Sequence, residues 1–182
     1  MAMNLIVGQS GGPTAVINSS LAGVYETAKN LGVNKVYGML YGIEGLLQEK
    51  MVDLDDMLGD IMSIELLKRT PSSYLGSCRC KLPTPEQDES VYDTLFRLFD
   101  KYEIGALLYI GGNDSMDTIA KLSAYGARIR SKVRFIGVPK TIDNDLMLTD
   151  HTPGYGSAAK YIATILKEVI ADASVYDIRS VT

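Results

Sequence analysis

The sequence predicts an α/β fold with a mainly parallel sheet and helices on both of its faces. Along 182 residues, short apolar runs suited to buried strands alternate with longer stretches in which apolar residues recur every three or four positions. Such alternation implies parallel strands joined by right-handed crossovers. Three of the apolar runs end in glycine-rich or polar turns. We therefore expect a three-layer, Rossmann-like domain whose turns meet at the carboxyl edge of the sheet, where ligands bind in this class of fold.

Length and composition indicate one globular domain. A chain of 182 residues with 46% hydrophobic and 22% charged residues can build a single well-packed core. No apolar run approaches the roughly 18 residues that span a bilayer, and no basic segment leads into an apolar one at the N-terminus, so we expect a cytoplasmic protein without a membrane partner. A net charge of −4 argues against nucleic-acid binding but not against a small anionic ligand.

Cysteine and histidine are too scarce for several kinds of site. Cys78 and Cys80 are the only cysteines, and His151 is the only histidine. They cannot form a disulfide framework and provide too few ligands for the usual zinc site. A Ser-His-Asp relay would have to use His151, which lies near no nucleophile elbow. We expect two reduced thiols without a catalytic role.

The first strand and helix enclose a glycine-rich turn. Residues 5–8 predict the strand and GQSGGPT, residues 8–14, the turn; a helix is predicted by apolar residues at Ile17, Leu21, Val24, Ala28 and Leu31. Glycines let the backbone approach an anion, and a helix N-terminus presents free N–H groups to it. The glycine spacing differs from the dinucleotide-binding fingerprint, and the lysine of a P-loop is absent. A tight turn without a ligand explains this segment equally well.

The middle of the chain is less regular. Residues 34–40 predict a strand and residues 41–47 a turn with a short helical piece. Within residues 51–68 we expect a helix, with four acidic residues early in it: Asp53, Asp55, Asp56 and Asp60. This placement suits the helix dipole, so a solvated first turn is preferred to a metal site. Residues 70–85 predict a loop, in which Arg79 has the planar guanidinium that suits phosphate, although loop arginines are usually only solvated.

A second glycine turn follows the strand predicted over residues 106–110, which is preceded by a helix starting near Val91. Gly111 and Gly112 end this strand, and Asn113, Asp114 and Ser115 precede another apolar helical stripe. Asp114 or Ser115 could serve only as a helix N-cap, which leaves an alternative without a ligand.

The third turn is the most polar. The strand predicted over residues 133–138 leads into PKTIDND, residues 139–145. Pro139 has no N–H to donate and is expected to stop the strand ladder, so that Lys140, Thr141 and the following carboxylates lie on a loop at the carboxyl edge.

Convergence of the three turns favours a ligand site over three unrelated turns. Glycines, carboxylates and one lysine together indicate a polyphosphate and its divalent metal ion. Residues 158–170 then predict a helix, and residues 178–182 look like the start of a further strand. Because sheet proteins rarely end there, we expect this chain to be part of a longer enzyme.

The order of the motifs GQSGGPT, YGIEGL, GSCRCK, GGNDS, PKTIDND and TDHTPGYGSAAKYIA, within residues 8–163, resembles the N-terminal domain of the 6-phosphofructokinases. The resemblance covers nearly the whole chain, and TIDND after an α/β strand is highly specific to that family. It implies that residues 1–182 form the phosphoryl-donor-binding domain, with the substrate domain absent from this chain. The implied reaction is phosphoryl transfer, with Mg²⁺, to the 1-hydroxyl of fructose 6-phosphate, which gives fructose 1,6-bisphosphate in glycolysis.

The resemblance also implies residue roles. Asp143 would accept the hydroxyl proton, Thr141 would help to hold the reacting groups, and Asp145 would support the site. Phosphoryl-donor contacts fall on Gly11, Gly12, Arg79, Gly112, Asn113, Asp114 and Lys140, with Tyr41 at a further donor-side position. Asp114 and Asn113 are the expected metal ligands. Many members have a Mg²⁺-linked aspartate where this chain has Asn113, which shifts the expectation toward Asp114, Asp143 or Asp145.

Two positions bear on which phosphoryl donor is used. ATP-dependent members carry glycine where this chain has Asp114 and Lys140. A carboxylate at the first position obstructs a nucleotide, and a lysine at the second can bind pyrophosphate. The pair therefore resembles the pyrophosphate-dependent branch; the alternatives are an ATP-dependent enzyme with an unusual site and a non-catalytic phosphate-binding regulatory module. Because the family's sugar-phosphate residues lie in a further half and partly in a neighbouring subunit, we expect a homo-oligomer in full-length form and little activity from this chain alone.

Overall fold

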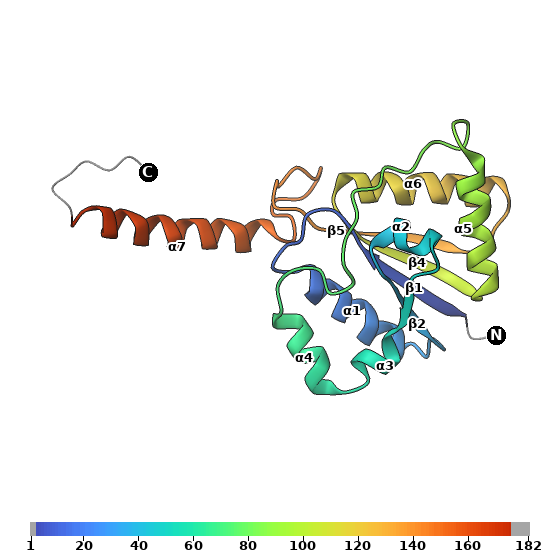
Figure 1. Ribbon diagram of the computed structural model, residues 1–182, viewed down its shortest axis with the longest axis horizontal. Helices are drawn as coiled ribbons and strands as arrows, with labels where there is room; N and C mark the ends of the chain where they lie inside the picture. The colour runs from blue at the N-terminus through green and yellow to red at the C-terminus, as the bar shows by residue number, and fades with distance from the viewer. Residues whose placement is uncertain (1–2, 176–182) are drawn as a thin grey trace.

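The computed structural model describes residues 3–175, which contain one five-stranded sheet between two layers of helices (Figure 1). The strands are β1 (Asn4–Gln9), β2 (Val36–Met39), β3 (Met51–Asp53), β4 (Ile104–Gly111) and β5 (Arg134–Pro139). Their order is β3-β2-β1-β4-β5; β2, β1, β4 and β5 run parallel, and β3 pairs antiparallel with β2. The predicted α/β class with a mainly parallel sheet is confirmed.

The helices are α1 (Ile17–Asn30), α2 (Gly42–Leu47), α3 (Leu54–Leu58), α4 (Ile61–Arg69), α5 (Glu89–Lys101), α6 (Asn113–Arg128) and α7 (Tyr155–Ala173). Alternate side chains of the central strand β1 enter two cores: Ile6 lies with residues of α2, α5 and α6, whereas Leu5 and Val7 lie with residues of α1, α3 and α4. All of β1 is buried, as expected for a parallel strand covered on both faces. The predicted three layers are therefore present.

The region from residue 51 to residue 69 differs from the single helix expected there. It forms β3, α3 and α4, and an aspartate caps the start of each helix: Asp53 accepts from the N–H of Asp55 at 3.1 Å, and Asp60 accepts from the N–H of Ser63 at 2.9 Å. An N-cap carboxylate satisfies a free N–H of the first turn and so fixes where a helix begins. The acidic residues thus lie at helix N-termini, as expected. In residues 3–175 no group of three or more His, Cys, Asp and Glu side chains is placed to hold a metal ion.

Helix α7 extends away from the rest of the domain (Figure 1). None of its side chains is buried, and its apolar stripe, which includes Ile162, Leu166 and Ile170, is exposed. The strand expected from residue 178 lies outside the described residues. Within the described part of the chain, no helix is long and apolar enough to cross a membrane.

Candidate phosphate-binding site

A cavity of about 490 Å³ lies at the carboxyl ends of β1, β4 and β5, beside the start of α6. Its lining comes from residues 10–14, 78–80, 112–115 and 140–143. The three turns predicted to meet at this edge do so, and the loop that carries Arg79 joins them. Every residue predicted for the site lines the cavity except Asp145 and the additional position Tyr41.

The turn after β1 needs glycine at residue 11. Gly11 has a φ of 75°, in the left-handed region, and its N–H donates to the carbonyl of Cys78 at 3.0 Å. A Cβ atom at this position would lie 3.2 Å from Nζ of Lys140. The turn therefore adopts a conformation that favours glycine and leaves room for the lysine.

Lys140 is the buried cation of the cavity, with only 3% of its surface exposed. Its Nζ donates to the carbonyl of Gly12 at 2.6 Å. Burial lowers its pKa, Arg79 lowers it further, and the nearby charge of Asp143 raises it. A buried ammonium with a backbone partner and a cavity beside it is well suited to binding an anion.

Pro139 does not stop the ladder as predicted. It aligns with Gly111 in the β4–β5 register, and the N–H of Lys140 donates to the carbonyl of Gly111 at 2.9 Å. Because β5 is an edge strand, a proline costs it no hydrogen bond when the missing N–H would face away from the sheet. The ladder thus continues far enough to fix the backbone of Lys140 directly.

The loop after Lys140 presents a carboxylate to the cavity. The hydroxyl of Thr141 donates to Asp143 Oδ2 at 3.2 Å and accepts from the N–H of Asp143 at 3.1 Å. Thr141 is buried, whereas Asp143 is exposed and lines the cavity. A carboxylate held by one short local turn and open on its other side is placed to accept a proton from a ligand.

Helix α6 directs its N-terminus at the same cavity. The N-cap residue is Gly112, so Asp114 and Ser115 are not N-caps as the alternative had proposed. The free N–H groups at a helix start favour an anion. The buried Ser115 hydroxyl instead hydrogen-bonds the hydroxyl of Ser10, which joins the first two turns.

The predicted metal ligands surround this helix start. Asp114 lies in the first turn of α6, exposed, with Nζ of Lys81 at 3.6 Å. Asn113 donates through Nδ2 to Asp145 Oδ2 at 2.7 Å, so its amide oxygen stays available and Asp145 is linked to the site from outside the cavity lining. Mg²⁺ is usually held by one or two carboxylates together with substrate phosphates. This set of oxygens fits such a shared site.

Sequence reasoning missed the buried amides that position Arg79. Gln9 and Asn18 are 0% and 1% exposed. Gln9 Nε2 donates to Asn18 Oδ1 at 3.0 Å, and Gln9 Oε1 accepts from the N–H of Leu75 at 2.9 Å; Asn18 Nδ2 donates to the carbonyl of Thr70 at 2.8 Å. These contacts tie β1 and α1 to the loop that leads to Arg79. An amide on the inward face of an apolar helix is the signal that could have revealed them.

Tyr41, which was expected at a further donor-side position, does not line this cavity. Tyr41 has a left-handed φ of 56°, and its ring packs over Gly76, where a Cβ would lie 2.6 Å from the ring. Its N–H donates to the carbonyl of Leu75 at 2.8 Å. In this structure Tyr41 therefore supports the loop before Arg79.

A mainly parallel α/β sheet with a glycine turn, a buried lysine and a helix N-terminus around one cavity is the arrangement typical of phosphate-binding α/β proteins. The family model described as Phosphofructokinase matches residues 4–181. The chain therefore belongs to the phosphofructokinase family, which confirms the resemblance drawn from its motifs.

Relatives in the family make the likeness more specific. The chain is 41% identical over 173 residues to a pyrophosphate–fructose 6-phosphate 1-phosphotransferase of Methylococcus capsulatus, covering 94% of this chain and 41% of the relative. It is 36% identical to a sulfofructose kinase of Alkalicoccus urumqiensis, covering 88% of this chain and 40% of that protein. The crystal structure of a pyrophosphate-dependent phosphofructokinase from Nitrosospira multiformis superposes with a TM-score of 0.88 at 40% identity, over 96% of this chain and 43% of that one. The chain thus spans about two fifths of the length of these proteins.

Proposed function

We propose that this chain is the phosphoryl-donor side of a pyrophosphate-dependent 6-phosphofructokinase. The reaction transfers a phosphoryl group from inorganic pyrophosphate to the 1-hydroxyl of fructose 6-phosphate and yields fructose 1,6-bisphosphate and phosphate, as a step of glycolysis. The observation that carries the proposal is the buried Lys140, bonded to Gly12 beside Gly11 in the cavity. The names of the relatives support pyrophosphate as the phosphoryl donor.

The phosphates would be bound by groups of three kinds. The backbone at Gly11 and Gly12 allows close approach, the N-terminus of α6 presents N–H groups, and Lys140 and Arg79 supply positive charge. In phosphoryl transfer most of the catalysis is positioning and charge stabilisation, so these groups need to hold the phosphates in line with the attacking hydroxyl. Mg²⁺ bound by Asp114 and the amide oxygen of Asn113 would neutralise phosphate charge.

Asp143 would act as the general base. Its carboxylate takes the proton of the sugar hydroxyl while that oxygen forms a bond to phosphorus and the bridging bond of pyrophosphate breaks. Thr141 keeps the carboxylate turned toward the cavity through the hydrogen bonds at 3.2 and 3.1 Å. Asp145 supports the site through Asn113.

The choice of phosphoryl donor is tested by competition between pyrophosphate and ATP, with Mg²⁺, in the complete protein. Asp114 puts negative charge at the α6 end of the cavity, where a nucleotide's inner phosphate would have to pass, whereas Lys140 can bind compact pyrophosphate. We expect turnover with pyrophosphate and none with ATP. Comparable efficiency with ATP would contradict the assignment and favour the ATP-dependent alternative.

A test on the 182-residue chain separates binding from turnover. The sugar-phosphate site would lie in a further part of the protein and partly in a neighbouring subunit of a homo-oligomer. We therefore expect calorimetry to detect pyrophosphate binding by this chain, with no turnover of fructose 6-phosphate. Turnover at a rate typical of an intact enzyme would contradict this division of labour. We further propose the cytoplasm as its compartment, on the support of the free thiols of Cys78 and Cys80.

The identity of the sugar has a second candidate. A sulfofructose kinase is 36% identical over most of this chain, so a related donor side occurs beside a different sugar. Assaying the complete protein with fructose 6-phosphate and with sulfofructose compares the two sugars directly. We expect the higher kcat/KM with fructose 6-phosphate.

A further inference from the structure

The loop between β5 and α7 is closed at its base by backbone contacts. The N–H of Thr141 donates to the carbonyl of Pro153 at 3.0 Å, and the hydroxyl of Thr152 donates to the carbonyl of Thr141 at 2.8 Å. Thr141 also forms a parallel bridge with Gly154. These contacts fix the start of the loop but leave the segment that carries Asp143 to be held in another way.

Apolar packing contributes little to holding that segment. Of its large apolar side chains, Ile142, Met147 and Leu148 are exposed, Met147 and Leu148 almost completely, and Leu146 is only half-buried. A loop segment without a fully buried apolar side chain depends largely on hydrogen bonds for a fixed conformation. The position of Asp143 therefore depends on the polar contacts of its neighbours.

Asn144 makes the contacts that link this segment back to the chain before α7. Its Oδ1 accepts from the N–H of Thr152 at 2.9 Å, and its Nδ2 donates to the carbonyl of Asp150 at 3.1 Å. Its φ is 55°, in the left-handed region, which asparagine tolerates better than most residues. Both the backbone and the carboxamide of Asn144 thus suit this place.

The reversal at Asn144 separates the two carboxylates beside it. Asp143 turns back to the hydroxyl of Thr141 and lines the cavity, while Asp145 accepts from Asn113 at the start of α6. The left-handed residue thus lies at the point where the chain directs the two flanking carboxylates to different partners.

We propose that Asn144 is a positioning residue that holds Asp143 in the orientation needed for proton transfer. The proposal rests on the proposed function, because it assigns Asn144 to the placement of the general base. The proposed pyrophosphate contacts at Gly11 and Arg79 come from other segments. Lys140 precedes the loop segment, and its backbone is held by its own hydrogen bond to the carbonyl of Gly111 at 2.9 Å. Loss of the Asn144 contacts is therefore expected to lower kcat and to leave pyrophosphate affinity nearly unchanged.

Two substitutions in the complete protein separate backbone from side chain. Asn144→Gly keeps the left-handed conformation but removes both hydrogen bonds. Asn144→Asp keeps an acceptor for Thr152 and loses the donor to Asp150. We expect kcat to fall on the order of 10- to 100-fold in Asn144→Gly and less in Asn144→Asp, because small misplacements of reacting groups cost rates of this size. The KM and Kd for pyrophosphate should stay within about twofold.

A control residue is Arg130, exposed in the turn after α6 with a left-handed φ of 57°. Arg130→Gly should leave kcat unchanged, which shows that glycine at a left-handed position is harmless away from the cavity. If Asn144→Gly does not fold, the kcat of Asn144→Asp decides instead.

The outcomes distinguish this inference from the proposed function. If Asp143→Asn abolishes turnover but both Asn144 variants keep normal kcat, the inference is wrong and the proposed function stands. A parallel loss of kcat, pyrophosphate affinity and thermal stability in both variants would mean general disruption and would also overturn it. If the unaltered protein binds no pyrophosphate, the proposed function itself fails.

Discussion

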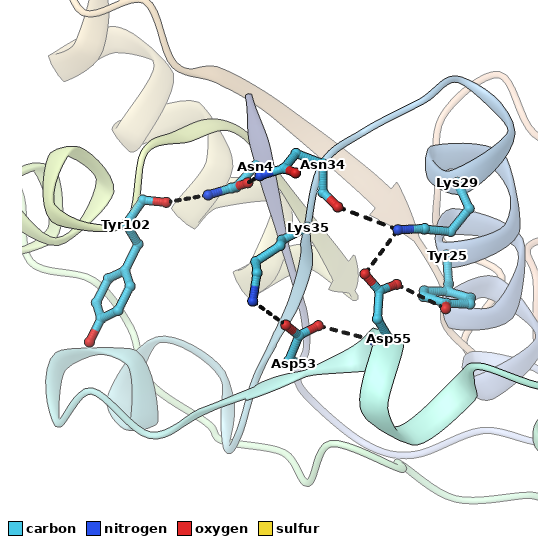
Figure 2. A network of polar contacts seen from close by, with 8 residues as sticks. All are labelled: Asn4, Tyr25, Lys29, Asn34, Lys35, Asp53, Asp55 and Tyr102. Atoms are coloured by element: carbon cyan, nitrogen blue, oxygen red, sulfur yellow. Dashed lines mark hydrogen bonds and ion pairs between the residues drawn. The ribbon is translucent and has the colours of Figure 1, made fainter. Parts of the chain in front are cut away.

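Polar and charged side chains gather at both ends of the parallel strands, which are the amino edge and the carboxyl edge of the sheet, but their partners differ between the two. At the amino edge, eight residues form one network (Figure 2): Asn4, Tyr25, Lys29, Asn34, Lys35, Asp53, Asp55 and Tyr102. Lys29 pairs with Asp55 at 2.9 Å, and Lys35 pairs with Asp53 at 2.8 Å. Tyr25 donates to Asp55 at 3.0 Å, and burial together with Asp55 raises its pKa to about 12. Each cation of this network has a carboxylate partner.

At the carboxyl edge, charged side chains line a cavity instead of pairing with one another. Lys140 donates to a backbone carbonyl, the side-chain partner of Asp143 is a hydroxyl, and Arg79 has no ion pair within residues 3–175. Burial lowers the pKa of Lys140, which is a cost that a bound anion would offset. The contrast indicates that the paired charges of the amino edge serve the fold and that Lys140, Arg79 and Asp143 serve a ligand. Asp114 is the exception at the cavity, because it lies 3.6 Å from Nζ of the exposed Lys81.

Replacing one carboxylate at each edge should give the largest difference in kcat between the two edges. Asp143→Asn removes the proposed base, so we expect kcat in the complete protein to fall about 10²- to 10⁴-fold, with pyrophosphate binding retained. Asp55→Asn at the amino edge should leave kcat unchanged. Steady-state kinetics and calorimetry measure both; normal turnover in Asp143→Asn would remove the distinction between the edges and favour a non-catalytic module.

How far the sequence predicts these edges depends on the kind of contact. Alternating strand and helix patterns were enough to bring Gly11, Gly111 and Lys140 together, because parallel strands share one carboxyl edge. The place of Arg79 was not derivable from pattern, since its loop is fixed by the buried amides of Gln9 and Asn18. The break between α3 and α4 was missed because Asp53 and Asp60 act as two separate caps.

Replacing one lysine at each edge should give a smaller difference, which is measured as pyrophosphate affinity. Lys140→Met removes the buried ammonium, and we expect pyrophosphate affinity to fall on the order of 10- to 100-fold, which corresponds to one charge-assisted hydrogen bond. Lys29→Met should not change it. Calorimetry on both variants is the measurement, and equal affinities in the two would contradict the role of Lys140.

The pH dependence of the same binding sharpens this prediction. The pKa of Lys140 lies below the ordinary lysine value of 10.5 because burial disfavours its charged form. Only the protonated form carries the charge that attracts phosphate, so affinity should fall as pH rises through this lowered pKa. In Lys140→Met the alkaline decline should be absent; its persistence would assign it to another group.

The smallest effect is expected for the free energy of unfolding when the Lys29–Asp55 ion pair of the amino edge is removed. Lys29 and Asp55 are 36% and 31% exposed in their side chains, so water screens their ion pair and its coupling should be about 0.2–1 kcal/mol. A double-mutant cycle of Lys29→Met and Asp55→Asn, followed by chemical unfolding, measures this free energy. Because Asp55 also accepts from Tyr25, Asp55→Asn alone should destabilise more than Lys29→Met. Pyrophosphate affinity should stay constant through the cycle, since no residue of this network lines the cavity; a change in affinity would mean that the two edges are coupled through the strands between them.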